Sequence, residues 1–135
     1  MNENEIGTLI LEAAITLHKK LGPGLMENVY ELSLFELLVQ KGLHVQRQVP
    51  IPIEIEGKYF DKGFRADLLV EGKVLVELKS VAEIIIRHKK QLLTYMKLAN
   101  IKLGYILNFG APLMRDGIVR LVHAEDAEGH RDTMI

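Results

Sequence analysis

Along the first 40 residues, apolar side chains recur every three or four positions, which is the period of an amphipathic helix. The pattern breaks at Gly22-Pro23-Gly24, because proline and glycine together cannot continue a helix. We therefore expect one helix that ends near Leu21 and a second from about Leu25 to near Gly42. The apolar positions of these two helices are Ile6, Leu9, Ile10, Ala13, Ala14, Leu17 and Leu21, then Leu25, Val29, Leu32, Phe35 and either Leu38 or Val39.

From Val45 the apolar period changes to two, which is typical of a half-buried strand. The apolar positions of this strand are Val49, Ile51, Ile53 and Ile55, and the alternating positions are Gln48, Pro50, Pro52 and Glu54. Because proline has no N–H to donate to a ladder, Pro50 and Pro52 indicate a sheet edge or a bulge. An exposed edge of this kind is also a candidate interface for a homodimer.

The rest of the chain alternates between turns and regular segments. Glu56-Gly57-Lys58 and Glu71-Gly72-Lys73 read as turns, and Gly63 marks a bend within an extended segment. A helix is expected next; Ser80 and Glu83 resemble its capping box, although Ile84-Ile85-Ile86 also suits an extended start. The expected elements are strands over Tyr59–Val70 and Val74–Lys79, a helix over about Glu83–Ala99, and strands over Ile101–Phe109 and Gly117–Val122.

This order of helix, helix, three strands, helix and two strands indicates an α/β fold. We expect a mixed sheet with an antiparallel meander, flanked by helices and completed by a helical crossover. A single domain should cover residues 1–122, and the polar residues 123–135 should form a poorly ordered tail.

Composition narrows the class of protein. A chain of 135 residues can bury a core unaided, and its 48% hydrophobic and 26% charged content is ordinary for a soluble protein. The absence of cysteine excludes disulfides, thiolate zinc sites and cysteine nucleophiles. The start MNENEIGTLILEAAITLHKK resembles neither a signal peptide nor a membrane span, so we expect a cytoplasmic protein that does not contact the membrane.

A formal net charge of −1 argues against a general electrostatic attraction to nucleic acid. Contact with a phosphate backbone would have to come from local basic runs, of which Arg87-His88-Lys89-Lys90 is the clearest, followed by Lys19-Lys20. Because such a run is usually a solvated helix face, it does not by itself decide the function.

The turn at Glu71-Gly72-Lys73 allows the flanking strands to be registered. If these residues form the loop, Val70 pairs with Val74, and Asp67 then lies opposite Glu77 on the same face as Lys79. Directly opposed carboxylates repel each other, and a hard divalent cation between them removes the penalty. The alternative is a surface hairpin whose two acids and lysine form only weak, solvent-exposed ion pairs. A two-residue loop would also put the two acids out of register. The apolar neighbours Leu69, Leu75 and Leu78 instead indicate burial on both faces.

This spacing of Asp67, Glu77 and Lys79 resembles the D…(D/E)xK signature of the PD-(D/E)xK nuclease superfamily. Gln91 and Tyr95 resemble the Q-x-x-x-Y element of one of its branches. Residues 24–30 spell G-x-x-E-x-x-Y, and with RADLLVEGKVLVELKS, HKKQLLTYMKL and LGYILNFG the chain is similar to the GxxExxY protein family as far as about residue 121. One departure from the superfamily pattern is Ala66, which replaces the proline before the aspartate.

The resemblance implies a restriction-endonuclease-like core and a Mg²⁺- or Mn²⁺-dependent nuclease that acts on DNA or RNA. The implied metal ligands are Glu27, Asp67, Glu77 and the main-chain carbonyl of Leu78. The implied catalytic residues are Asp67, Glu77, Lys79, Gln91 and Tyr95, and the implied substrate-binding residues are Tyr30, His88, Lys89 and Lys90.

Each implied residue also has a structural reading. Glu27 would be an acid favourably placed at a helix N-terminus, Tyr30 and Tyr95 core aromatics, and Gln91 a solvated helix residue. An alternative function for the whole chain is a catalytically silent nuclease-fold module that binds nucleic acid or a protein partner. A structure without the pairing of Asp67 and Glu77 would instead favour an unrelated α/β protein.

Overall fold

The computed structural model describes residues 1–60, 65–126 and 129–134. Its elements are, in chain order, α1 (Glu3–Leu21), α2 (Glu27–Gln40), β1 (Val45–Pro50), β2 (Ile53–Ile55), β3 (Lys58–Phe60), β4 (Arg65–Val70), β5 (Val74–Lys79), α3 (Ile86–Ala99), β6 (Leu103–Asn108), the 3-10 helix η1 (Met114–Gly117), β7 (Ile118–Asp126) and β8 (Gly129–Met134). None of the helices in these ranges combines the length and the apolarity that a membrane crossing needs.

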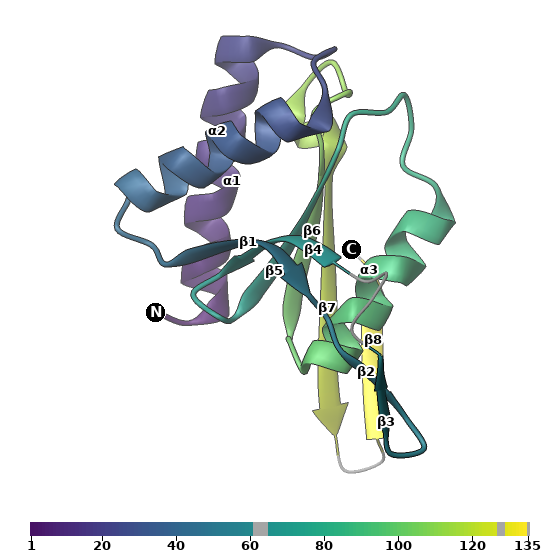
Figure 1. The fold of residues 1–135 in the computed structure, drawn as a ribbon. Coiled ribbons are helices and arrows are strands. Elements are labelled where there is room, and N and C mark those ends of the chain that lie inside the picture. The colour runs from purple at the N-terminus through teal and green to yellow at the C-terminus, as the bar shows by residue number, and fades with distance from the viewer. Residues whose placement is uncertain (61–64, 127–128, 135) are drawn as a thin grey trace.

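The main sheet has six strands in the order β1-β4-β5-β6-β7-β8. The pair β5–β6 is parallel and is connected through α3, whereas the neighbouring pairs are antiparallel. Helices α1 and α2 cover one face of this sheet and α3 lies on the other (Figure 1). The predicted mixed sheet, with its meander, helical crossover and flanking helices, is therefore confirmed.

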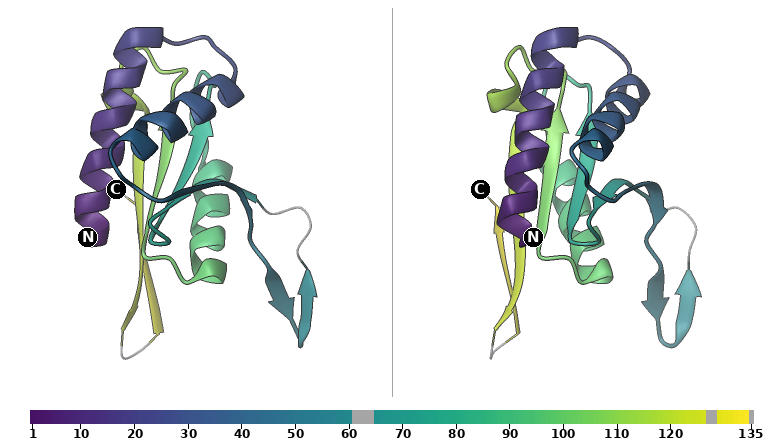
Figure 2. Two further views of the ribbon diagram at one scale, coloured as in Figure 1. Left: turned by 60° about the vertical axis from the view of Figure 1, so that its left-hand side comes forward. Right: turned by 90° about the vertical axis from the view of Figure 1, so that its left-hand side faces the viewer.

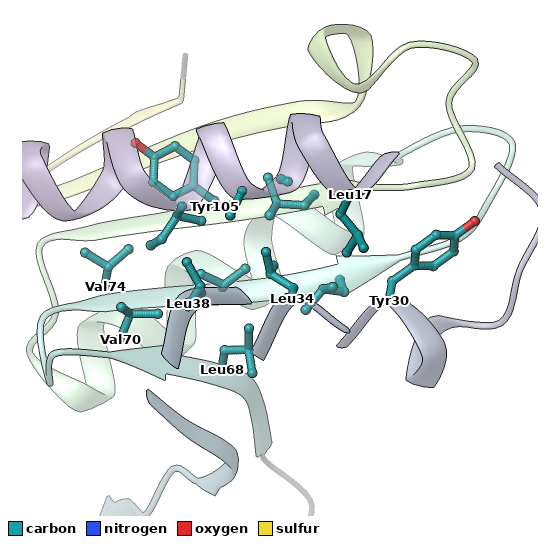
Figure 3. Packing of buried hydrophobic residues seen from close by; sticks show 14 of the residues in the cluster. Leu17, Tyr30, Leu34, Leu38, Leu68, Val70, Val74 and Tyr105 are labelled. Atoms are coloured by element: carbon teal, nitrogen blue, oxygen red, sulfur yellow. The ribbon is translucent and has the colours of Figure 1, made fainter. Parts of the chain in front are cut away.

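The larger core lies between the sheet and the helices α1 and α2. Figure 3 shows Leu17 of α1 and Leu34 and Leu38 of α2 packed beside Leu68, Val70 and Val74 of the hairpin β4–β5. In a strand, alternate side chains point to opposite faces. From Leu68 to Leu78 the even-numbered strand residues of this hairpin enter the core, so the odd-numbered strand residues between them point to the face on which α3 lies.

The strand predicted from Val45 to Ile55 is divided in two. Ile51 and Pro52 belong to neither part, which fits the missing N–H groups of Pro50 and Pro52. β1 is an edge strand of the main sheet, as the prolines predicted, whereas β2 pairs with β3 in a hairpin that extends away from the sheet (Figure 2). Pairing of this edge with a second copy stays a prediction, and Gly63 lies outside the described residues.

Helix α3 begins later than its predicted start near Glu83. Its first residue is Ile86, and the N–H of Ile85 donates to His88 Nδ1 at 3.2 Å. The capping box predicted at Ser80 is wrong, because the Ser80 hydroxyl donates to the carbonyl of Leu25 at 2.6 Å. The buried Asn108 holds the loop before α3 through two hydrogen bonds to the main chain of Val81.

The sheet continues past the predicted end of its last strand at residue 122. β7 runs to Asp126 and pairs with β8, where a polar, poorly ordered tail was expected. Polar composition does not prevent this, because an antiparallel hairpin satisfies its backbone groups internally while one face stays in water.

The loop between α1 and α2 is fixed by Tyr30. The Tyr30 ring is completely buried and stacks on Phe109, with 4.3 Å between the ring centroids. Its hydroxyl donates to the carbonyl of Gly22 and accepts from the N–H of Leu25 at 3.1 Å. Gly24 has a φ of +101°, a conformation that favours glycine. Tyr30 was predicted to bind substrate; the structure shows instead a core aromatic with a satisfied hydroxyl.

Tyr30→Phe should therefore lower the free energy of unfolding by about 1–3 kcal/mol, because the Gly22 carbonyl and the Leu25 N–H lose their common partner. Chemical denaturation measures this change. Tyr59→Phe is the control, since Tyr59 is 73% exposed and should change stability by less than about 0.5 kcal/mol. Equal stability losses in the two variants would contradict the role given to the Tyr30 hydroxyl.

Candidate active site

The register predicted for the β4–β5 hairpin is confirmed: Val70 pairs with Val74 and Leu68 with Val76. Beyond this pair the two strands are joined through side chains. Asp67 Oδ2 accepts the N–H of Leu78 at 2.8 Å, and Glu77 Oε1 accepts the N–H of Asp67 at 3.2 Å. The two half-buried carboxyl groups therefore lie together where the ladder gives way to side-chain contacts.

The surroundings of these acids favour a proton on the pair. Burial, and then the charge of Asp67, raise the pKa of Glu77 to about 8. Burial also raises the pKa of Asp67, against the hydrogen bond from the Leu78 N–H, and the charge of Glu31 adds to the increase. Contact between the two carboxyl groups raises the pKa of Glu77 further and acts to lower that of Asp67. Without a cation, the pair thus holds a shared proton near neutral pH.

Lys79 lies on the same face of β5 as Glu77. Its ammonium group acts to lower the pKa of Glu77 against burial, and it also contributes to a lowered pKa of His88, for which burial is the main cause. Lys79 is thus within electrostatic reach of both the acid pair and the first turn of α3. Asp67, Glu77 and Lys79, three of the predicted catalytic residues, therefore lie close together in the structure.

Helix α3 also brings Tyr95 to this face. Burial raises the pKa of the Tyr95 hydroxyl, and the charges of Glu77 and Asp67 raise it further, while a hydrogen bond from Gln91 opposes the change. Tyr95 is buried and Gln91 is exposed, one helical turn apart. These predicted residues therefore adjoin the carboxyl pair from the helix side of the site.

Glu27 occupies a different position from the one predicted. It is exposed in the first turn of α2 and lines an open hollow of about 530 Å³ together with Ser80. Its charge acts on His88. Among the residues that the structure describes, no three acids or histidines lie close enough to hold a metal ion. The predicted group of Glu27, Asp67 and Glu77 is therefore not assembled, and coordination by Glu27 stays a prediction.

The acid of α2 that is linked to Asp67 is Glu31, which the sequence analysis did not select. Glu31 is buried and forms an ion pair with Arg47 at 2.8 Å. Gln48 Nε2 donates to Glu31 Oε1 at 2.6 Å and to Asp67 Oδ1 at 3.3 Å. Helical spacing in the sequence could have indicated this role. Glu31 precedes Leu34 and Leu38 by three and seven residues, so it shares their buried face.

The basic run at the start of α3 is divided between two directions. His88 lies within electrostatic reach of Lys79, whereas Lys89 lines a separate hollow of about 360 Å³ that also includes Glu83 and Asp116. Lys90 is exposed on the helix surface. The three predicted substrate-binding residues of this run therefore do not form one surface in common.

The donor atoms around Asp67 and Glu77 suit a hard cation. Two adjacent carboxylates are the ligands that Mg²⁺ usually takes from a protein. The N–H and C=O of one strand residue point to the same side, so the Leu78 carbonyl faces the side from which its N–H reaches Asp67. The next carbonyl, that of Lys79, is already bound by the N–H of Phe109 in the opposite direction. The residues present thus fit the predicted ion.

A family model described as the PD-(D/E)XK nuclease superfamily matches residues 4–121, which includes all of the site residues described above. No curated protein and no solved structure matches the chain.

The shared proton predicts how stability depends on pH. Glu77 ionises near its ordinary value of 4.5 when unfolded and at about 8 when folded, so the folded chain holds an additional proton between these values. The free energy of unfolding should therefore fall as the pH rises through this range. Glu77→Gln mimics the protonated form and should remove most of this loss, so its melting temperature should exceed that of wild type by an amount that grows from pH 5 to pH 8.

Thermal unfolding without divalent cations measures this difference. Glu36→Gln, at an exposed position of α2, is the matched control and should follow wild type at each pH. A Glu77→Gln variant whose melting temperature runs parallel to wild type would contradict the shared proton.

Proposed function

The chain belongs to the PD-(D/E)XK nuclease superfamily, and from this membership and its half-buried carboxyl pair we propose that it is a metal-dependent nuclease. The reaction proposed is hydrolysis of a phosphodiester bond in DNA or RNA with Mg²⁺ or Mn²⁺. The observation that carries the proposal is the pairing of Asp67 and Glu77, joined by their hydrogen bonds at the end of a strand ladder and adjoined by Lys79.

A structural role explains this pair poorly. Two half-buried acids beside each other destabilise a hairpin, and replacement by apolar residues of similar size would remove the cost. The chain keeps the acids in contact and holds them with main-chain N–H groups. Perturbed acids in such an arrangement are typical of functional sites. The side chains of Asp67 and Glu77 and the Leu78 carbonyl are the proposed ligands.

A divalent cation at these ligands would polarise the scissile phosphate and acidify a bound water. Lys79 is proposed to orient the attacking water and to stabilise the negative charge that develops on the phosphate. An ammonium group suits this role, because it is a compact charge with three hydrogen-bond donors. The Asp67 and Glu77 carboxyl groups release their shared proton when they take up the ligand role.

Helix α3 is proposed to supply the remaining groups. Gln91 and Tyr95 lie on the helix side of the carboxyl pair and would position the scissile phosphate or the water. His88 lies within electrostatic reach of Lys79 and would contact the phosphate backbone, with Lys90 extending this contact along the helix surface. Lys89 would contribute only after turning away from its neighbours Glu83 and Asp116.

Within the superfamily, the GxxExxY family is the finer assignment that we propose. The roles of the motif residues support it: Gly24 and Tyr30 shape the loop, and Glu27 follows this loop at the first residue of α2. Ser80 binds the same loop through the Leu25 carbonyl, which connects the motif to the end of β5. The motif thus brings the start of α2 next to the strand that carries Glu77 and Lys79.

Metal-dependent cleavage should be lost in Asp67→Asn and reduced at least about 100-fold in Lys79→Met, because one removes a ligand charge and the other the group that assists the water. A panel of single- and double-stranded DNA and RNA, with Mg²⁺ and with Mn²⁺, measures this. Lys102→Met is the control, since Lys102 is exposed and precedes β6 at the end of the sheet opposite Lys79.

Two results of this panel would contradict the proposal. If wild type cleaves no substrate with either metal, the nuclease proposal fails and the catalytically silent module is favoured. If Lys79→Met cleaves at the wild-type rate, Lys79 has no part in the reaction.

The basic residues of α3 predict a salt-dependent contribution to binding. Replacing Lys89 and Lys90 by alanine should raise the Kd for an oligonucleotide several-fold and make the salt dependence of binding less steep by about one unit per lost phosphate contact. Fluorescence anisotropy in an Asp67→Asn background measures Kd across a salt series. The control is the double replacement of Lys19 and Lys20, the adjacent exposed lysines at the end of α1. An equal effect of both double variants would argue against specific contact by α3.

A further inference from the structure

Gln48 has an unusual backbone for a residue within a strand. Its neighbours in β1 pair with β4, Arg47 with Leu68 and Val49 with Ala66, so Gln48 lies opposite Asp67. Its φ is +52°, in the left-handed region that side chains other than glycine, asparagine and aspartate seldom adopt. The ladder is interrupted at this one residue and resumes after it.

The other non-glycine residues with a positive φ, among those described, have local explanations. Glu56 and Glu71 lie in the turns of the two hairpins before β3 and β5, and Asn100 caps the end of α3. Turns and helix ends often require this conformation. Gln48 lies inside β1, where no turn requires it, so its tertiary contacts must hold it there.

These contacts lead directly to the carboxyl pair. The Gln48 amide donates to Glu31 Oε1 at 2.6 Å and to Asp67 Oδ1 at 3.3 Å. The other oxygen of Asp67 accepts the Leu78 N–H at 2.8 Å, so both oxygens of Asp67 are restrained. On the far side, Arg47 binds Glu31 Oε2 through two nitrogens, at 2.8 and 3.1 Å. The amide is therefore held from α2 and reaches Asp67.

We propose that Gln48 is a positioning residue that orients the Asp67 carboxylate for the divalent cation, an inference that rests on the proposed function. The bond to Glu31 fixes the amide, and the amide fixes Asp67 Oδ1. The same amide separates two carboxylates that would otherwise face each other without a donor between them. A ligand that is already oriented loses less rotational freedom when it binds the ion.

Two substitutions at this position separate the amide from the backbone. Gln48→Gly and Gln48→Ala both remove the amide, but glycine accepts a φ of +52° readily and alanine does not. Gln48→Ala should therefore have a lower melting temperature than Gln48→Gly. Both variants should bind Mn²⁺ about 10- to 100-fold more weakly than wild type, the loss typical when a group that hydrogen-bonds to a metal ligand is removed.

Isothermal calorimetry with Mn²⁺ measures the affinity, and thermal unfolding measures the stability. Gln46→Ala is the matched control: an exposed glutamine of the same strand, two residues away, which should leave Mn²⁺ affinity unchanged. At saturating Mn²⁺, the cleavage rate of Gln48→Gly should return to within a few-fold of wild type. A structural role alone would make the affinity follow stability, with Gln48→Gly close to wild type.

Each outcome decides the inference. Equal Mn²⁺ affinity in wild type and both Gln48 variants overturns it while leaving the proposed nuclease intact. A wild type that binds no Mn²⁺, with Asp67→Ala indistinguishable from it, overturns the proposed function and this inference together. Weak affinity in both Gln48 variants, with Gln46→Ala unchanged, supports the positioning role.

Discussion

Two acids meet where the pairing of β4 with β5 ends, and the surrounding elements keep them together against their mutual repulsion. Asp67 and Glu77 each accept a main-chain N–H from the opposite strand, so their side chains replace the ladder that would otherwise continue. Burial raises the pKa of both groups and favours a shared proton. Helix α3 closes one side with Tyr95, and α2 reaches the pair through Glu31 and Gln48. The site is thus assembled from three layers of the fold.

The residues of the G-x-x-E-x-x-Y segment divide their roles between packing and charge. Tyr30 closes the loop before α2 and stacks in the core, which explains an aromatic residue at that position without any contact to substrate. Glu27 begins the helix at the rim of the site, near His88. The residue after Tyr30, Glu31, is the one joined to Asp67 through Gln48. The motif therefore identifies the segment that helps to build the candidate site. The residue that is linked to Asp67, however, is Glu31, which directly follows the motif.

Local rules predicted the hairpin, because a three-residue turn fixes the register and strand alternation fixes the face of Asp67, Glu77 and Lys79. They failed where distant contacts decide. Ser80 binds the loop of Leu25 instead of capping α3, and the proline pair sends β2 into a separate hairpin. The bridge from Glu31 to Asp67 joins residues far apart in sequence through a strained Gln48. Neither hydrophobic periodicity nor secondary-structure propensity predicts such a bridge. The position of Glu31 on the buried face of its helix is the one feature that indicated it.

The shared proton also explains how one sequence can both fold and keep the acid pair of the proposed cation site. With both acids ionised, the pair would face strong repulsion in a buried setting, and the ammonium group of Lys79 offsets only part of it. A proton on Glu77 relieves this repulsion in the free chain, and a divalent cation would relieve it more fully by replacing the proton. Cation and proton then compete for the same two carboxyl groups. Binding should consequently strengthen as the pH rises through the pKa of Glu77 and level off above it, where no proton remains to be displaced.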